Sequence, residues 1–189
     1  MKKLLLATLM FAAFAAAAPI QFTINTSALN GEAGTIDIQF NPGAFPAVYD
    51  PGTATITNFL ITGGTLGPIS AGPDGGVAGA LPGPLVLTNL DFLNGLVHDA
   101  TFGSQVSFLV DFAGLAYTAP SPSILSSFSV TLSSNSGAIT ALADLIGDSK
   151  LDTSGSSPEV SSVPEPGTWS MLALGLGALG FAARRRRIQ

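Results

Sequence analysis

Hydrophobic and polar residues alternate along much of the chain between residues 21 and 133. A period of two is typical of a β-strand that buries one face and exposes the other. Four stretches show this period clearly: Gln21–Thr26, Thr35–Phe40, Val106–Phe112 and Ser127–Ser133. The apolar residues that we expect to face the core are Phe22, Ile24, Ile36, Ile38, Phe40, Val106, Phe108, Val110, Phe112, Phe128, Val130 and Leu132.

Two further runs rich in β-branched or apolar residues, Thr53–Thr62 and Leu85–Phe92, also predict strands. Clusters of Gly, Pro, Asn, Asp and Ser separate all these runs and mark turns. Seven or eight short strands with little helix predict a mainly β fold: an antiparallel β-sandwich, jelly-roll-like, occupying residues 18–153.

Other segments read differently. The loop 30–34 is long enough for a hairpin between its flanking strands, and Asn94-Gly95 is a tight-turn signal. Residues 68–84 are the least ordered-looking stretch because of their Gly-Pro and Gly-Gly pairs. Ile139–Ile146 is a candidate for a turn or two of helix. Residues 154–162, rich in Ser and without an apolar face, predict a linker.

The N-terminus has the form of a secretory signal peptide over residues 1–17. Two lysines precede an apolar stretch and an alanine run, as in such signals. Cleavage after Ala17 places Ala15 and Ala17 at the two small positions that signal peptidase requires, and avoids leaving Pro19 directly after the cut.

The C-terminus, residues 163–189, has three parts. The first is Val163-Pro164-Glu165-Pro166, which its prolines hold extended. An uncharged run over 168–183 follows and predicts a short transmembrane helix. The last part is a cluster of arginines that would stop translocation and keep this end in the cytoplasm, namely Arg184, Arg185, Arg186 and Arg187.

This tripartite tail resembles the PEP-CTERM sorting signal of Gram-negative bacteria that make exopolysaccharide. The resemblance implies that an exosortase-type membrane protease recognises the tail and processes the chain near Pro164-Glu165-Pro166. It further implies transient anchoring in the inner membrane, followed by release to the cell surface or the extracellular matrix. The alternative reading of the tail is a plain single-pass anchor.

Between the two targeting ends lie eleven acidic residues and one lysine, a net charge of about −10. Such a surface repels nucleic acid and anionic lipid. The chain has no cysteine, which excludes thiol catalysis and cysteine metal sites.

Candidate chemistry is sparse. His98, the one histidine, is followed by Asp99, but neighbours on a strand point to opposite faces, so Asp99 is badly placed to orient it. We expect a surface or strand-end histidine. Calcium takes carboxylates and carbonyls, and weak candidate ligands are Asp74, Asp148 and Asp152. We expect turns or solvated loops at these residues rather than a calcium site, because Asp before Gly is typical of a turn.

Asp37, Asp91 and Asp111 could supply paired carboxylates for glycoside hydrolysis, but the first and last lie on polar strand faces where solvated charges belong. A carbohydrate-binding face would use exposed aromatics, for which Tyr49 and Tyr117 are the candidates outside the tail. The sequence therefore predicts an exported, non-enzymatic surface or matrix protein that needs no cofactor. The alternatives are a carbohydrate-binding module of the exopolysaccharide and a β-sandwich hydrolase.

Overall fold

A computed structural model describes residues 19–43, 50–120, 125–148 and 150–164. The predicted signal peptide, the membrane run 168–183, the arginine cluster and Tyr49 lie outside these ranges. Within them, no helix is both long enough and apolar enough to cross a membrane.

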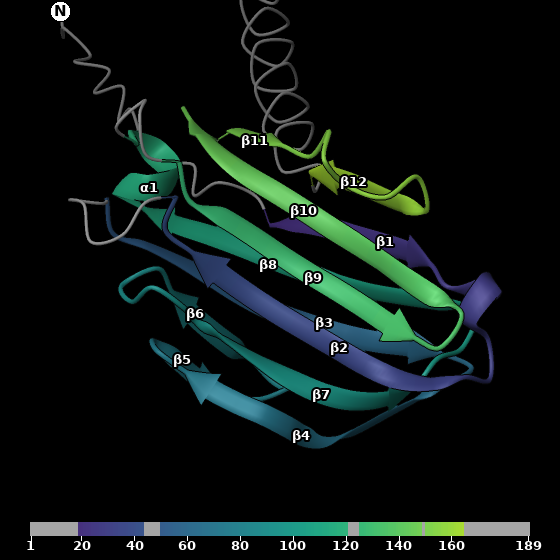
Figure 1. Ribbon diagram of the computed structural model, residues 1–189. Coiled ribbons are helices and arrows are strands. Elements are labelled where there is room, and N and C mark those ends of the chain that lie inside the picture. The colour runs from purple at the N-terminus through teal and green to yellow at the C-terminus, as the bar shows by residue number, and fades with distance from the viewer. Residues whose placement is uncertain (1–18, 44–49, 121–124, 149, 165–189) are drawn as a thin grey trace, which may run out of the picture.

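The described residues form two antiparallel sheets packed face to face, the β-sandwich that the sequence predicts (Figure 1). Sheet A contains, in spatial order, β12 (Val160–Pro164), β1 (Ile20–Asn25), β8 (Gln105–Gly114), β3 (Gly52–Thr62), β6 (Leu85–Thr88) and β5 (Val77–Gly79). Sheet B contains β11 (Lys150–Asp152), β10 (Gly137–Gly147), β9 (Ser127–Ser134), β2 (Ala33–Asn41), β7 (Gly95–Thr101) and β4 (Thr65–Asp74). Among the described residues, helical structure is limited to a 3-10 turn, Ser27–Leu29, and α1 (Leu115–Thr118).

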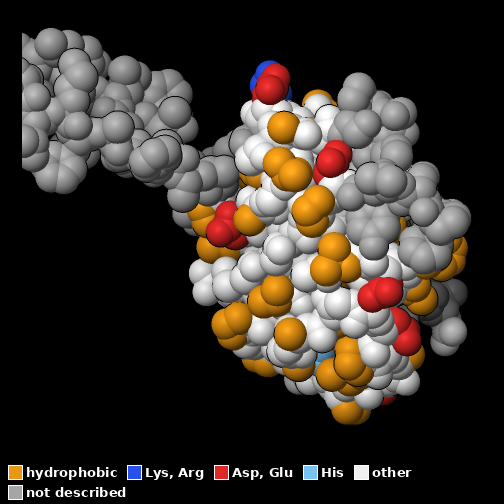
Figure 2. All heavy atoms as spheres, turned by 90° about the vertical axis from the view of Figure 1, so that its left-hand side faces the viewer, with side chains coloured by type: hydrophobic (Ala, Val, Ile, Leu, Met, Phe, Trp, Pro, Cys, Tyr) orange, Lys and Arg blue, Asp and Glu red, His pale blue; other side chains and the backbone are white. Residues whose placement is uncertain are grey.

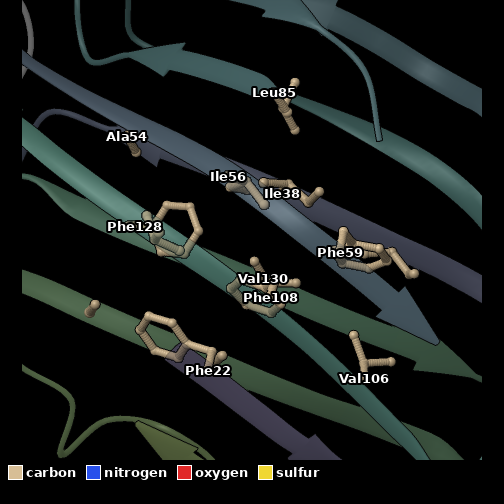
Figure 3. Close-up of a cluster of buried hydrophobic side chains, with 14 of the residues drawn as sticks. Phe22, Ile38, Ala54, Ile56, Phe59, Leu85, Val106, Phe108, Phe128 and Val130 are labelled. Carbon is tan, nitrogen blue, oxygen red and sulfur yellow. The ribbon is translucent and has the colours of Figure 1, made fainter. Parts of the chain in front are cut away.

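The core lies between the sheets and is built from the alternating positions of the strands. All twelve residues predicted to face inward are buried. Aromatic rings join the two sheets (Figure 3). Phe128 of β9 in sheet B meets Phe112 of β8 in sheet A edge to face at 5.5 Å and lies 6.2 Å from Phe22 of β1 in sheet A. Within sheet A, Phe22 stacks on Phe108 of β8 with ring centroids 5.3 Å apart. Rings and aliphatic side chains of this size supply most of the apolar area that stabilises the sandwich.

The strand pairs are nested in the sequence. β1 pairs with β8, β2 with β7 and β3 with β6, so the chain winds back and forth between the sheets. The hairpin expected across residues 30–34 is therefore wrong, because β1 and β2 lie in different sheets. Asn94-Gly95 likewise forms no hairpin turn. It ends the crossing from β6 in sheet A to β7 in sheet B.

The helix expected over Ile139–Ile146 is also wrong, because this segment belongs to β10. Its apolar residues fit a helical spacing, but Ile139, Ala141, Ala143 and Leu145 also alternate, and these four are buried against the core. The two alanines made the alternation faint in the sequence. Pairing with β9 along eight residues decides the conformation over local propensity.

Residues 68–84 are more regular than expected, since β4 runs to Asp74 and β5 follows. β4 is an edge strand with breaks in its register against β7, which accommodate its glycines and prolines. The predicted linker also differs. Its last residues, Val160–Ser162, begin β12, which pairs with β1 because β1 would otherwise expose its backbone edge.

Candidate functional site

A pocket lies on the outer face of sheet B, where the start of β7 lies between β2 and the end of β4. Its volume is about 180 Å³. The residues around this space, called here the Asp37 pocket, are Asp37, Gln39, Ala71, Asp74, Leu93, Gly95, Leu96 and Val97. Two carboxylates and one amide thus share the pocket with apolar side chains.

Asp37 is half-buried in the middle of β2 and is held by the next outward residue. Nε2 of Gln39 donates a hydrogen bond to Oδ2 of Asp37 at 2.9 Å, and Nδ2 of Asn41 donates to Oε1 of Gln39 at 2.8 Å. Burial raises the pKa of the Asp37 carboxyl, and the bond from Gln39 opposes this in part. A ladder of polar side chains therefore fixes the Asp37 carboxylate at the pocket.

Asn94 holds the loops at the rim of the pocket. Its backbone N–H donates to Oδ1 of Asn41 at 2.8 Å, and its own Oδ1 accepts from the backbone N–H of Gly76 at 2.9 Å. The turn after Asp74 requires glycine, since Gly75 has φ +62° and a side chain there would collide with the Leu93 carbonyl. Asp74 itself is the last residue of β4, directly before this turn.

The chemistry of the Asp37 pocket suits a small polyhydroxylated ligand. Carboxylate oxygens accept hydrogen bonds from hydroxyl groups, and an amide can both donate and accept. Leu93 and Val97 offer apolar contact to carbon-bound hydrogens. Sequence reasoning placed Asp37 among solvated charges and missed its half-burial. The available signal was the polar side chain at every second residue, Asp37-x-Gln39-x-Asn41.

The second candidate region is the edge of sheet A at β12, which leads into the C-terminal tail (Figure 1). Val163 and Pro164 are the last residues of β12, and they lie opposite Gln21 and Ile20 of β1. Glu165, Pro166 and the rest of the tail lie outside the described residues.

A family profile described as the PEP-CTERM protein-sorting motif matches residues 162–187. The chain carries a PEP-CTERM sorting motif at its C-terminal end. The motif implies export and membrane-associated sorting in a Gram-negative bacterium, with processing by an exosortase-type membrane enzyme. No curated protein and no solved structure matches the chain.

In the folded domain ahead of this motif, His98 is not at the surface as expected but in the core, only 3% exposed. Its Nδ1 lies 3.1 Å from the carbonyl oxygen of Gly67, which can only accept, so Nδ1 carries the proton. Nε2 is buried and has no partner among the described residues. Asp99 points away and is exposed, as the alternation along the strand predicts.

The three calcium candidates do not come together. Asp74 ends β4 at one edge of sheet B, whereas Asp152 lies in β11 at the other edge. Asp148 is exposed beside Lys150, with Nζ and Oδ2 3.8 Å apart. Across the described part of the chain, no three histidine, cysteine or acidic side chains converge as metal ligands.

The candidate hydrolytic carboxylates are also separated. Asp37 lies on the outer face of sheet B, Asp111 is exposed on sheet A, and Asp91 is exposed in the loop between β6 and β7. Tyr117 is buried against Phe112, with ring centroids 5.6 Å apart, so it cannot form a sugar-binding surface.

Proposed function

We propose that this protein is an exported, non-enzymatic component of the cell surface or the exopolysaccharide matrix, delivered there by its PEP-CTERM tail. The observation that carries the proposal is the match of the sorting motif to residues 162–187, which begins in the last strand of the β-sandwich. The signal peptide over 1–17 and the membrane run over 168–183 supply entry and transient anchoring.

The surface of the sandwich suits a protein that must stay soluble outside the cell. Acidic side chains are spread as separate red groups over the face in Figure 2, and blue atoms lie only at one tip beside a red group. Two features favour a non-enzymatic role. His98 is inside the core, and Asp37 and Asp111 lie on the outer faces of different sheets.

The test is replacement of Pro164, Glu165 and Pro166 by alanine in a host that carries the exosortase. Alanine removes the carboxylate and the fixed backbone that the protease recognises. We expect the variant to accumulate in the membrane at full length, while the wild type appears outside the cell, shorter by the mass of the tail. Immunoblots of membrane and extracellular fractions measure this.

Glu159→Ala is the matched control, because it removes an exposed carboxylate just before the matched residues. It should be processed as the wild type is. If wild type and triple variant both stay at full length in the membrane, the tail is a plain anchor and the proposal fails.

A second candidate function, carbohydrate binding within the matrix, is favoured by the Asp37 pocket. Its volume of about 180 Å³ and its carboxylate and amide groups fit one sugar unit. The acidic surface disfavours negatively charged polysaccharides, so we propose a neutral or amino sugar.

A glycan array probed with wild type, Asp37→Asn and Asp111→Asn tests this function. Each variant loses one carboxylate, but only Asp37 lines the pocket. We expect Asp37→Asn alone to lose binding, by about ten-fold for a hydrogen bond to a charged group. Release of reducing sugar from a bound glycan would instead support the hydrolase, since Asp74 is a second carboxylate in the same pocket.

We further infer that the sandwich is of the jelly-roll type. In that fold eight strands wind as nested antiparallel pairs across two sheets. The pairs β1–β8, β2–β7 and β3–β6 support the inference, although β5 pairs with β6 rather than β4.

A further inference from the structure

The sorting motif begins inside the folded domain. The matched residues start at Ser162, and Ser162, Val163 and Pro164 are the last three residues of β12. Their partners on β1 are Phe22, Gln21 and Ile20. The backbone of the first matched residues is therefore paired with a strand at the opposite end of the sequence.

β12 is an edge strand with one neighbour. It ends the order of sheet A and pairs only with β1, over five residues. Its other hydrogen bonds within the described residues are few and mostly long: Oγ of Ser161 donates to the Thr23 carbonyl and Oγ of Ser162 to Oγ1 of Thr153, both at 3.4 Å, and the Val160 N–H donates to the Ser157 carbonyl at 3.0 Å. A short edge strand of this kind can detach locally while the rest of the sheet stays intact.

A protease binds its substrate as an extended peptide and pairs with the substrate backbone. In the folded domain, the side of β12 that faces β1 is already occupied. The sheet and the protease therefore compete for the same residues.

We propose that β12 is a latch on processing: the exosortase acts on the folded protein only when β12 is released from β1. This inference rests on the proposed sorting function. The stability of the β1–β12 pairing then sets the rate at which the folded domain is freed from its tail. Before release, the domain presents the start of its sorting motif as part of sheet A.

A disulfide across the pair tests the latch in the full-length protein. Thr23 and Ser161 lie directly opposite each other. Thr23 is half-buried and Ser161 is exposed. The chain has no native cysteine that could form a competing disulfide. Opposite Cα atoms in an antiparallel pair are about 4.5–5.5 Å apart, within the range of a disulfide. In Thr23→Cys/Ser161→Cys exported in the host, we expect processing to slow at least about ten-fold when oxidised and to recover on reduction.

The matched control uses the same residue of β1. Thr23 lies opposite Ser107 of β8 on its other side, so Thr23→Cys/Ser107→Cys crosslinks β1 while leaving β12 free. This control should be processed at the wild-type rate when oxidised.

Two outcomes would overturn the latch. The first is processing of the oxidised Thr23→Cys/Ser161→Cys variant at the control rate. The second is an equal block of processing in both crosslinked variants. Either result would mean that release of β12 does not limit the reaction. Processing of the wild type tests the proposed function separately. If the wild-type chain becomes shorter in the same host, the tail acts as a sorting signal even if the latch proposal is wrong.

Discussion

At the scale of single residues, His98 joins β7 to the edge strand β4 through its side chain. Its Nδ1 donates to the Gly67 carbonyl at 3.1 Å, where the register between β4 and β7 is broken. Replacing His98 by Leu would leave the Gly67 carbonyl without this donor, and we expect a loss of about 1–3 kcal/mol in the free energy of unfolding. Urea denaturation measures it.

His98→Asn is the matched variant, because its Nδ2 can still donate to the carbonyl. It should lose less stability than His98→Leu despite its smaller volume. A leucine variant as stable as the wild type would show that the imidazole makes no net contribution through this bond.

Asp37 provides a prediction about pH. Burial raises its pKa above 3.8 in the folded protein, so the folded state takes up a proton more readily than the unfolded state. Ionised Asp37 thus disfavours folding at neutral pH, and this penalty disappears as pH falls through the raised pKa toward 3.8. We expect Asp37→Asn to be more stable than wild type near neutral pH and to lose that advantage in acid.

Asp111→Asn is the control for Asp37→Asn. Urea denaturation at neutral and at acidic pH measures the free energy of unfolding of both variants. Removing any one negative charge relieves repulsion in a protein of this net charge, and Asp111→Asn measures that general effect. If the two variants gain equally at neutral pH, the half-burial of Asp37 has no energetic consequence.

At the scale of elements, substitutions at two adjacent residues of β10 test whether this segment is a strand or a helix. Ala141 faces the core and is fully buried, whereas Thr140 is half-buried on the outer face, where its hydroxyl oxygen lies 3.1 Å from that of Thr131. An aspartate at 141 would place an unpaired charge in the core, and we expect a loss of about 3–5 kcal/mol.

Thr140→Asp is the neighbouring control and should cost about 1 kcal/mol or less, since solvent can reach the outer face. Chemical denaturation of both variants makes the comparison. Equal losses at the two positions would contradict the strand assignment of β10.

The elements that were predictable from sequence are those with large, alternating side chains. β2, β8 and β9 each carry at least three large apolar residues at successive inward positions, so their period of two identified strand and core together. The sequence did not predict β10 as a strand because two of its inward positions are alanine. β12 could not be recognised because a serine-rich edge strand is specified by its partner β1, which is distant in the sequence.

The Asp37 pocket was hidden for a related reason. Its walls come from β2, β4, β7 and the loop before β7, and only the pairing of these strands brings Asp37 near Asp74. The sorting tail, in contrast, was readable directly, since its residues are contiguous and its recognition depends on local sequence.

At the scale of the whole molecule, repulsion among the acidic side chains lowers stability, and no single residue determines this effect. Eleven acids and one lysine lie between the targeting segments, and screening of their field depends on salt. Raising ionic strength from about 10 mM to 0.15 M shortens the Debye length from about 30 Å to 8 Å. For a chain ending at Pro164, which keeps β12, we expect the melting temperature to rise with sodium chloride.

A comparison of calcium with magnesium distinguishes this general charge screening from binding of calcium at a specific site. With calcium and magnesium chlorides at matched ionic strength, screening alone raises the melting temperature equally, and a chelator added at constant ionic strength leaves it unchanged. We expect this result, because the carboxylates of Asp74 and Asp152 are held at opposite edges of sheet B. A rise specific to calcium would contradict it, and the variants Asp74→Asn and Asp148→Asn/Asp152→Asn would then show which edge binds the ion.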